Sequence, residues 1–308
     1  MFRTVAIHFG ERIGVRDNWL TVAREEGEQR IPIEDLYSVV IDNPQASLSV
    51  TAIHRLTDAG VHVLICNEKH HPVSVILPQN NHYRPLNVIR RQIELSSDFK
   101  NALWDRIIRA KIENQAQVLR LCGRSTERST RLTELATEVT DGDKGNREGI
   151  AAKMFFKELY GFTFVRMHDD AINAALNYGY AIIRSACAKT LCAYGYNCVL
   201  GLHHINESNP FNLADDIMEP IRPLVDMWVD DNQEDLVDFL SRSHRNALAA
   251  IVNEIVCMDG KKMRLRNAID KYVNSLTTAI NKEDPSLLKI PQIIRTDLYR
   301  DEDEEEGR

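Results

Sequence analysis

Apolar and polar positions follow two different patterns along this chain. Up to about residue 78, short runs rich in β-branched residues are separated by Gly, Asp and Asn, which is typical of strands. The expected strands are TVAIHF, RIGVR, NWLTVA, RIPI, YSVVI, VHVLICN and PVSVIL. One helix is expected among them, over SLSVTAIHRLTDAG, with Ser47 or Ser49 as its N-cap and Gly60 at its end.

Helical spacing of apolar residues dominates the rest of the chain. Between Asn87 and about Lys282 the one segment that favours a strand is NCVLGLH. The segment DDAINAALNYGYAIIRSACAKTLCAYG predicts a long helix that Asp169 or Asp170 caps and that Gly195 ends.

These patterns predict an α+β protein with two domains. A small β-rich N-terminal domain is expected over residues 1–80, and a larger all-α catalytic domain over residues 89–296. The polar, proline-flanked stretch LPQNNHYRPL predicts a linker over residues 81–88. The last segment, residues 297–308, is acidic and is expected to be a disordered tail.

The composition fits an ordinary soluble protein, since 44% of the residues are apolar and 27% are charged. No apolar run reaches the length of about 18 residues that spans a membrane. The charged N-terminus lacks a signal-peptide pattern, so a cytoplasmic location is expected. The six cysteines form no CxxC pair, and Cys187, Cys192 and Cys198 are expected to be small buried residues rather than a zinc site.

The formal net charge of −7 conceals two basic segments. From Tyr83 to Leu132 there are 11 Lys and Arg against 5 Asp and Glu, and from Ser241 to Tyr272 there are 7 against 3. Such segments are most often solvated helix faces, but they can also hold a phosphate backbone. The candidates for DNA contact are Arg84, Arg90, Arg91, Lys261, Lys262, Arg264 and Arg266.

The stretch LGLHHINESNPFNLADDIMEPIRPLVD combines imidazoles with carboxylates. Asn212 is a possible N-cap and Asp215 a first-turn acid, while Pro220 predicts a kink. Asp216 and Glu219 are three residues apart, so they share a helical face that the preceding loop could approach with His204. One imidazole with carboxylates suits Mg²⁺ or Mn²⁺, although acids at a helix start are also common without a metal.

A further carboxylate occurs at the start of a helix expected from Asn146 to Gly161. Glu148 falls on the same inward face as Ala152 and Phe155, so it must be paired, metal-bound or exposed at a cleft. It could equally do no more than complement the helix N-terminus.

Three blocks of the chain together resemble the CRISPR-associated spacer integrase family, the Cas endonuclease and integrase subunit of adaptation modules. The blocks are NREGIAAKMFF, AINAALNYGYAIIRSA and the stretch from Leu200 to Asp226, which occur in the family's order and spacing. The resemblance covers roughly residues 1 to 290, and the His-His pair is most similar to variants beside type II effector nucleases.

The resemblance implies that Glu148, His204 and Glu219 are catalytic metal ligands for Mg²⁺ or Mn²⁺, with Asp216 as a further acid in some members. It gives no role to His203. The implied reaction joins the 3′-hydroxyl of a captured DNA fragment to a CRISPR repeat, or cleaves DNA when water attacks. The implied partners are double-stranded DNA fragments, repeat DNA, a second copy bound through the N-terminal domain, and a small second Cas protein in a hetero-hexameric complex. A type II effector nuclease is a further implied partner, and no membrane is involved.

Two other functions stay open at this point. A casposon-like transposon integrase would share the same site residues. A catalytically idle DNA-structure binder could retain the fold, although Glu148, His204 and Glu219 are all present.

Overall fold

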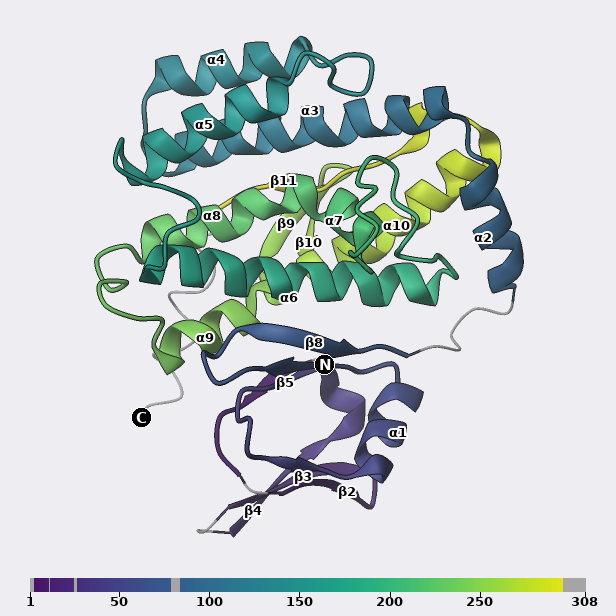
Figure 1. The fold of residues 1–308 in the computed structure, drawn as a ribbon, viewed down its shortest axis with the longest axis vertical. Helices are drawn as coiled ribbons and strands as arrows, with labels where there is room; N and C mark the ends of the chain where they lie inside the picture. The colour runs from purple at the N-terminus through teal and green to yellow at the C-terminus, as the bar shows by residue number, and fades with distance from the viewer. Residues whose placement is uncertain (1–2, 11, 25–26, 79–83, 296–308) are drawn as a thin grey trace.

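The computed structural model describes residues 3–10, 12–24, 27–78 and 84–295 (Figure 1). A strand-rich N-terminal part precedes a mostly helical part, which confirms the expected α+β order. The acidic tail expected over residues 297–308 lies outside the described residues. Within the described part, no helix is both long and apolar enough to span a membrane.

Two four-stranded sheets form the N-terminal part. The first has the order β1-β5-β7-β8, in which β8 alone is antiparallel to its neighbour, and the second has the order β4-β3-β2-β6. Helix α1 (Val50–Asp58) starts at the expected cap, because the Ser49 side chain accepts a hydrogen bond from the Ala52 amide. The strands are β1 (Arg3–Ile7), β2 (Arg12–Arg16), β3 (Trp19–Arg24), β4 (Gly27–Pro32), β5 (Leu36–Ile41), β6 (Ser47–Leu48), β7 (His62–Cys66) and β8 (Pro72–Ile76).

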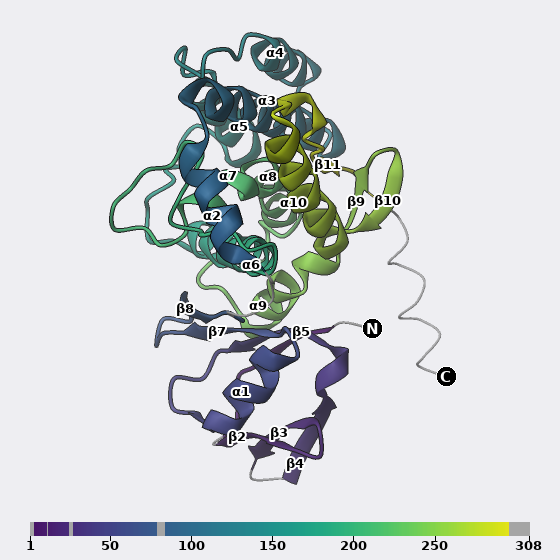
Figure 2. The ribbon, with the colours of Figure 1, turned by 90° about the vertical axis from the view of Figure 1, so that its right-hand side faces the viewer.

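The first sheet is covered on both faces. Val39 and Ile41 of β5 belong to the core between the two sheets, whereas Val40 belongs to the core of the helical part. Every residue of β5 is therefore buried, which explains its continuous apolar sequence LYSVVI. Figure 2 shows this sheet between α1 on one side and the helical part on the other.

The helical part contains the long helices expected from the sequence. Asp170 caps α6 and Asn146 caps α5, and both elements end next to the predicted glycines Gly195 and Gly161. The helices are α2 (Pro85–Glu94), α3 (Ser97–Leu121), α4 (Thr126–Thr137), α5 (Arg147–Tyr160), α6 (Ala171–Ala193), α7 (Asn212–Met218), α8 (Arg222–Asp231), α9 (Arg242–Ala249) and α10 (Leu265–Lys282), with the 3-10 segments η1 (Ile33–Asp35), η2 (Glu219–Ile221), η3 (Ile251–Asn253) and η4 (Pro285–Leu287).

The helical part is not all-α, which corrects the expectation for residues 89–296. Strands β9 (Ile255–Met258), β10 (Lys261–Arg264) and β11 (Gln292–Ile293) form a small antiparallel sheet. The turn between β9 and β10 places Asp259 and Gly260 at positive φ, the conformation that an Asp-Gly pair favours in a hairpin. That dipeptide was a usable signal, but the two lysines of β10 obscured the strand pattern.

One other expectation is wrong. The segment NCVLGLH is not a strand, because the chain turns where the Leu200 amide donates to the Asn197 carbonyl. Helix α2 begins at Pro85 and includes residues 85–88 of the expected linker, while residues 81–83 of that linker lie outside the described residues. Proline at the first helical position has the φ angle that a helix needs, and it loses no hydrogen bond there.

A buried carboxylate ties the N-terminal sheet to the helical part. Asp42, which follows β5, accepts hydrogen bonds from Arg245 Nε of α9, from His8 Nδ1 and from His70 Nδ1, each at 2.7 Å. Burial alone would raise the pKa of Asp42, but these three donors outweigh it and hold the pKa below its ordinary value. His8 also reaches Asn246 of α9 through its other ring nitrogen.

We expect Asp42→Asn to lower the free energy of unfolding by about 3 kcal/mol or more near neutral pH, because Arg245 would remain buried without its charge partner. The lowered pKa means that wild-type stabilisation is present above the ordinary carboxyl pKa and is lost as the pH falls through the folded-state pKa. The difference between the two proteins should therefore shrink on acidification. Denaturant titrations at several pH values measure it.

Asp17→Asn is the matched control, since Asp17 has an 85% exposed side chain and lies 3.8 Å from Arg16. Equal effects of the two substitutions, or an Asp42 effect that does not vary with pH, would contradict this account of the interface.

Candidate active site

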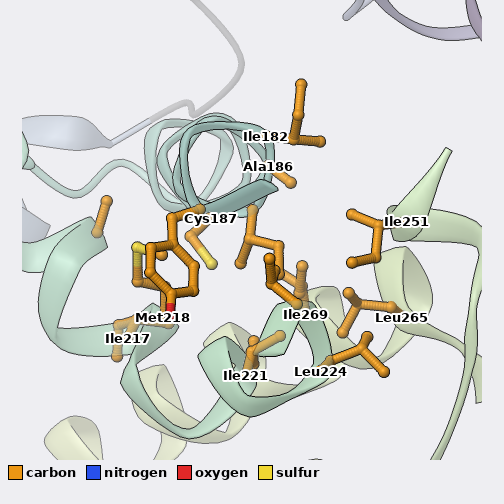
Figure 3. Close-up of a cluster of buried hydrophobic side chains, with 14 of the residues drawn as sticks. Ile182, Ala186, Cys187, Ile217, Met218, Ile221, Leu224, Ile251, Leu265 and Ile269 are labelled. Carbon is orange, nitrogen blue, oxygen red and sulfur yellow. The ribbon is translucent and has the colours of Figure 1, made fainter. Parts of the chain in front are cut away.

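The chain between α6 and α8 supplies two buried carboxylates. Asp216 lies in α7 and Glu219 opens η2, where Pro220 interrupts the helix as predicted. Figure 3 shows the neighbouring residues of this bend, Ile217, Met218 and Ile221, in one buried apolar cluster with residues of α6 such as Cys187. These apolar side chains fix the backbone that carries Asp216 and Glu219. Both carboxylate residues are almost completely buried.

Asp216 organises the loop that carries the histidines. Its Oδ2 accepts hydrogen bonds from the amides of Leu202 at 2.6 Å and His203 at 3.2 Å. Its Oδ1 accepts from the His204 amide at 3.1 Å and from His204 Nδ1 at 2.6 Å. This hydrogen bond raises the pKa of His204 and assigns Nδ1 as the donor, which leaves Nε2 for a ligand.

Only glycine fits at position 201, where the loop passes against α7. A Cβ there would lie 2.2 Å from the His204 carbonyl and 2.9 Å from Asp216 Oδ2. The Asn212 side chain also serves the loop, because its amide nitrogen donates to the carbonyls of Val199 and Asn206. Asn212 is the first residue of α7, and the N-cap is Phe211 rather than Asn212. Asp215 lies in the first turn, as expected.

His203, which has no role from sequence, packs against an aromatic residue of α3. Its ring stacks on Trp104 with centroids 4.2 Å apart and an angle of 1° between the planes. The same Trp104 meets His204 edge-on at 5.6 Å. Trp104 is 2% exposed, so a buried side chain supports both imidazoles.

Glu148 lies in the first turn of α5, as the sequence predicts. The N-cap Asn146 adopts a left-handed conformation, and its side chain accepts a hydrogen bond from the Gly149 amide. Asp143 adds a second anchor, because its two oxygens accept from the amides of Arg147 at 2.8 Å and Glu148 at 3.0 Å. The Glu148 carboxylate is thus held at a well-ordered helix start.

Lys111 of α3 brings the two glutamates together. Its ammonium lies 2.5 Å from Glu148 Oε1 and also pairs with Glu219 Oε2. Arg222 holds the other oxygen of Glu219 at 2.7 Å and stacks over the Tyr180 ring at 4.3 Å. Residues far apart in the chain therefore meet in one group of two carboxylates and two cations, in which Lys111 and Glu219 are buried and Glu148 and Arg222 are partly exposed.

The charges in this group stabilise one another. Burial raises the pKa of Glu219, but Arg222 and Lys111 outweigh it and lower that pKa to about 2. Burial likewise acts to lower the pKa of Lys111, yet Glu219 and Glu148 raise it above its ordinary value. Glu219 also contributes to the raised pKa of His204, which places the imidazole within its electrostatic reach.

Four residues of the site were not predicted from the sequence: Lys111, Trp104, Asp143 and Arg222. Trp104 and Lys111 are seven residues apart, so they share one face of α3 and reach both halves of the site. A usable signal for Lys111 was its position within the apolar stripe of that helix, between Ile108 and Ile112. A lysine on an inward face needs a buried anionic partner.

The donor set suits a hard divalent cation. Two carboxylates already converge on a positive charge, and the His204 imidazole, with its tautomer fixed by Asp216, lies within the electrostatic reach of Glu219; carboxylates with an imidazole match the ligand preferences of Mg²⁺ and Mn²⁺. Elsewhere in the described residues, Cys122, Asp230 and Asp231 offer ligand atoms within 4.8 Å of one another. Arginines already pair with both of these acids, Arg124 with Asp230 at 2.6 Å and Arg295 with Asp231 at 2.7 Å.

The seven basic candidates lie in different surroundings. Lys261 and Lys262 are exposed on β10, and Arg264 precedes α10. Arg266 is packed within the fold, since it donates to Asn253 and lies over the Tyr37 ring at 6.0 Å. Three others lie at or in α2 and are exposed: Arg84, Arg90 and Arg91.

The fold and the site together define a class of two-part α+β proteins, in which a strand-rich domain precedes a helical domain with a carboxylate–imidazole centre. The family model for the CRISPR associated protein Cas1 matches residues 5–232, and the chain belongs to this family. The resemblance inferred from the three sequence blocks is thereby confirmed.

Relatives match most of the chain. It is 34% identical to the CRISPR-associated endonuclease Cas1 of Neisseria meningitidis over 301 residues, which cover 97% of this chain and 99% of the relative. It is 27% identical to a CRISPR-associated endonuclease Cas1 of Pyrobaculum aerophilum over 269 residues, covering 81% and 90% of the two chains.

Solved structures share the fold at lower identity. A casposase bound to its integration product matches with a TM-score of 0.74 at 18% identity, covering 99% of this chain and 98% of the other. A Cas1 protein of Thermotoga maritima matches with a TM-score of 0.72 at 15% identity, covering 91% and 97%. A Cas6-RT-Cas1–Cas2 complex matches with a TM-score of 0.73 at 17% identity, covering 96% of this chain and 36% of the other.

We expect Asp216→Asn to lower the free energy of unfolding by about 3 kcal/mol, because the buried carboxylate accepts several charge-assisted hydrogen bonds from the loop. Asp215→Asn is the control, since the neighbouring Asp215 accepts one hydrogen bond, from Asn209, at a more exposed position. Denaturant titration of the two variants measures the difference. Equal losses would show that Asp216 does not organise the loop.

Proposed function

We propose that this chain is a divalent-metal-dependent DNA endonuclease and integrase of CRISPR adaptation. In this role it inserts captured DNA fragments into the CRISPR array, with the 3′-hydroxyl of the fragment as the nucleophile. Membership of the Cas1 family supports the proposal, together with relatives that are named CRISPR-associated endonucleases. The observation that carries it is the convergence of Glu148 and Glu219 on one cation position, with His204 within the electrostatic reach of Glu219.

Glu148, His204 and Glu219 would hold a Mg²⁺ or Mn²⁺ ion. When bound, such an ion polarises the phosphate, activates the attacking oxygen and stabilises charge on the leaving oxygen. Glu219 is ionised at neutral pH, since its pKa is lowered to about 2, so it needs to lose no proton to act as a ligand. Asp216 orients the imidazole of His204 through Oδ1 and accepts from loop amides through Oδ2, so both oxygens are occupied, which favours a positioning role over direct ligation.

The other residues of the site prepare it for an anionic substrate. Arg222 is held by Glu219 and by the Tyr180 ring, so its positive charge stays fixed beside the carboxylates. Trp104 excludes water from beneath the two imidazoles, which strengthens the electrostatic interactions of the site. With a 3′-hydroxyl as nucleophile the site joins two DNA strands, and with water it cleaves one.

The partners follow from the same proposal. We expect a homodimer formed through the N-terminal domain, a small second Cas adaptation protein that completes a hetero-hexameric complex, and assistance from a type II effector nuclease. A Cas6-RT-Cas1–Cas2 complex among the structural relatives supports the small partner. Lys261, Lys262, Arg264, Arg84, Arg90 and Arg91 are the residues that we expect to contact double-stranded fragments and repeat DNA.

A casposon-like integrase is the second candidate function. It is favoured by the likeness to a casposase bound to its integration product over nearly the whole of both chains. Integration assays with a CRISPR repeat and with an unrelated target of equal length separate the two, because only the adaptation enzyme should prefer the repeat.

Glu148→Ala and His204→Ala should each lower fragment integration with Mn²⁺ by more than about 100-fold, because losing a ligand costs more than losing one of its outer partners. Glu127→Ala is the matched control: Glu127 occupies the same helical position in α4 that Glu148 occupies in α5, but it is exposed. Undiminished integration by either site variant would refute the assigned roles.

Charge reversal at Lys261 and Lys262 should weaken DNA binding and make its salt dependence shallower, by about one unit of slope for each phosphate that these lysines no longer neutralise. Fluorescence anisotropy at several salt concentrations measures both quantities. Lys289→Glu serves as the control, because Lys289 pairs with Asp259 in the turn of the same hairpin. Unchanged affinity and slope in the Lys261 and Lys262 variant would remove β10 from the DNA-binding surface.

A further inference from the structure

Lys111 occupies the position at which a cation is needed in the site. Its side chain is 9% exposed and comes from the middle of α3, a helix whose inward face is otherwise mostly apolar. Among the described residues, the ion-pair partners of its ammonium are Glu148 and Glu219. These are the same two carboxylates that the proposed function assigns to a metal ion.

The charges of the group show what this lysine does. Glu148 and Glu219 carry two negative charges, and Lys111 and Arg222 carry two positive charges, so these four side chains are electrically neutral together. Without Lys111 the two carboxylates would repel one another, which is costly because Glu219 is buried. Lys111 therefore stabilises the arrangement of ligands before any metal ion arrives.

The two cations differ in how firmly they are held. Arg222 is fixed at Glu219 Oε1 and over the Tyr180 ring. Lys111 has a flexible four-carbon stem, and its ammonium pairs with the carboxylate oxygens that a metal ion would bind. A divalent ion can therefore replace Lys111 without removing Arg222.

We propose that Lys111 is an internal counter-ion of the metal site: it holds Glu148 and Glu219 together in the metal-free protein and competes with the divalent cation for them. The inference rests on the proposed metal-dependent function and adds to it a residue that lowers the intrinsic metal affinity. After the exchange, the two carboxylates are neutralised by the divalent ion, and the charges of Lys111 and Arg222 are in excess. That excess attracts phosphate, so metal binding and DNA binding strengthen each other.

The test is a titration of the DNA-free protein with Mn²⁺. Calorimetry and the electron paramagnetic resonance signal of the free ion measure the binding. Lys111→Met should bind Mn²⁺ about tenfold more tightly than the wild type, because the competing ammonium is gone. The metal-free variant should be less stable to denaturant than the wild type, and Mn²⁺ should restore more of its stability. A purely structural lysine would give equal or weaker metal binding on removal.

Three further variants make the outcome decisive. Lys111→Arg keeps the positive charge and should bind Mn²⁺ as weakly as the wild type. Lys111→Gln is neutral and polar, so it provides the same comparison if Lys111→Met does not fold. Lys289→Met removes a lysine remote from the site and should leave Mn²⁺ affinity unchanged.

Glu148→Gln separates failure of this inference from failure of the proposed function. If Glu148→Gln abolishes Mn²⁺ binding but neither neutral variant of Lys111 tightens it, the counter-ion role is wrong and the metal site stands. If Glu148→Gln leaves Mn²⁺ binding intact, the metal site itself is wrong and the inference fails with it.

The coupling to DNA is measured with Ca²⁺ as the divalent ion. Ca²⁺ should raise the affinity of the wild type for a short DNA duplex, and it should raise that of Lys111→Met by a smaller factor. An equal Ca²⁺ effect in both proteins would overturn the part of the proposal that assigns the released ammonium to phosphate.

Discussion

The site depends on the cost of burying charge. Glu148 and Glu219 can approach one another inside a helical domain only because Lys111 and Arg222 neutralise them there. This requirement brings α3, α5 and the bend between α7 and α8 together at one point, since each element contributes a charge that the others need. The surrounding apolar core of α6, α8 and α10 then fixes the geometry (Figure 3). Apolar residues of similar volume would stabilise the fold about as well as this ionic group, so stability does not account for it, and the proposed metal site does.

The Asp216 carboxylate holds the histidine loop in place, as Lys111 and Arg222 hold the two glutamates. Asp216 accepts hydrogen bonds from three loop amides and one imidazole nitrogen, and these bonds hold a segment that has no regular secondary structure. Gly201 permits the close approach, and Trp104 supports the rings from below. The loop and the glutamates are therefore each preorganised, as the proposed reaction at a charged phosphate requires.

Local sequence patterns predicted most of the helices and strands. Helix starts such as Ser49, Asn146 and Asp170 and the β-branched runs of the N-terminal strands depend on neighbours in the sequence, and these expectations are confirmed. The small sheet of β9, β10 and β11 was missed because one strand is short and lysine-rich and another lies about 30 residues away in the sequence. Lys111 and Trp104 were missed for a related reason: their partners are fixed by helix packing and not by spacing. Asp143 has local partners, the amides of Arg147 and Glu148, and was missed because it precedes the helix start expected at Asn146. Glu148, His204 and Glu219 were proposed through the family resemblance, and the structure brings Glu148 and Glu219 to one cation, the Lys111 ammonium.

The central claim is that Glu148, His204 and Glu219 hold one divalent ion in the place of the Lys111 ammonium. Anomalous diffraction from crystals of the protein with Mn²⁺ tests it most directly. The account predicts a peak bound by the two carboxylates and by His204 Nε2, with the Lys111 side chain turned away from both glutamates. A peak elsewhere, such as at Cys122, Asp230 and Asp231, or a Lys111 ammonium that still lies between the glutamates beside the ion, would contradict it.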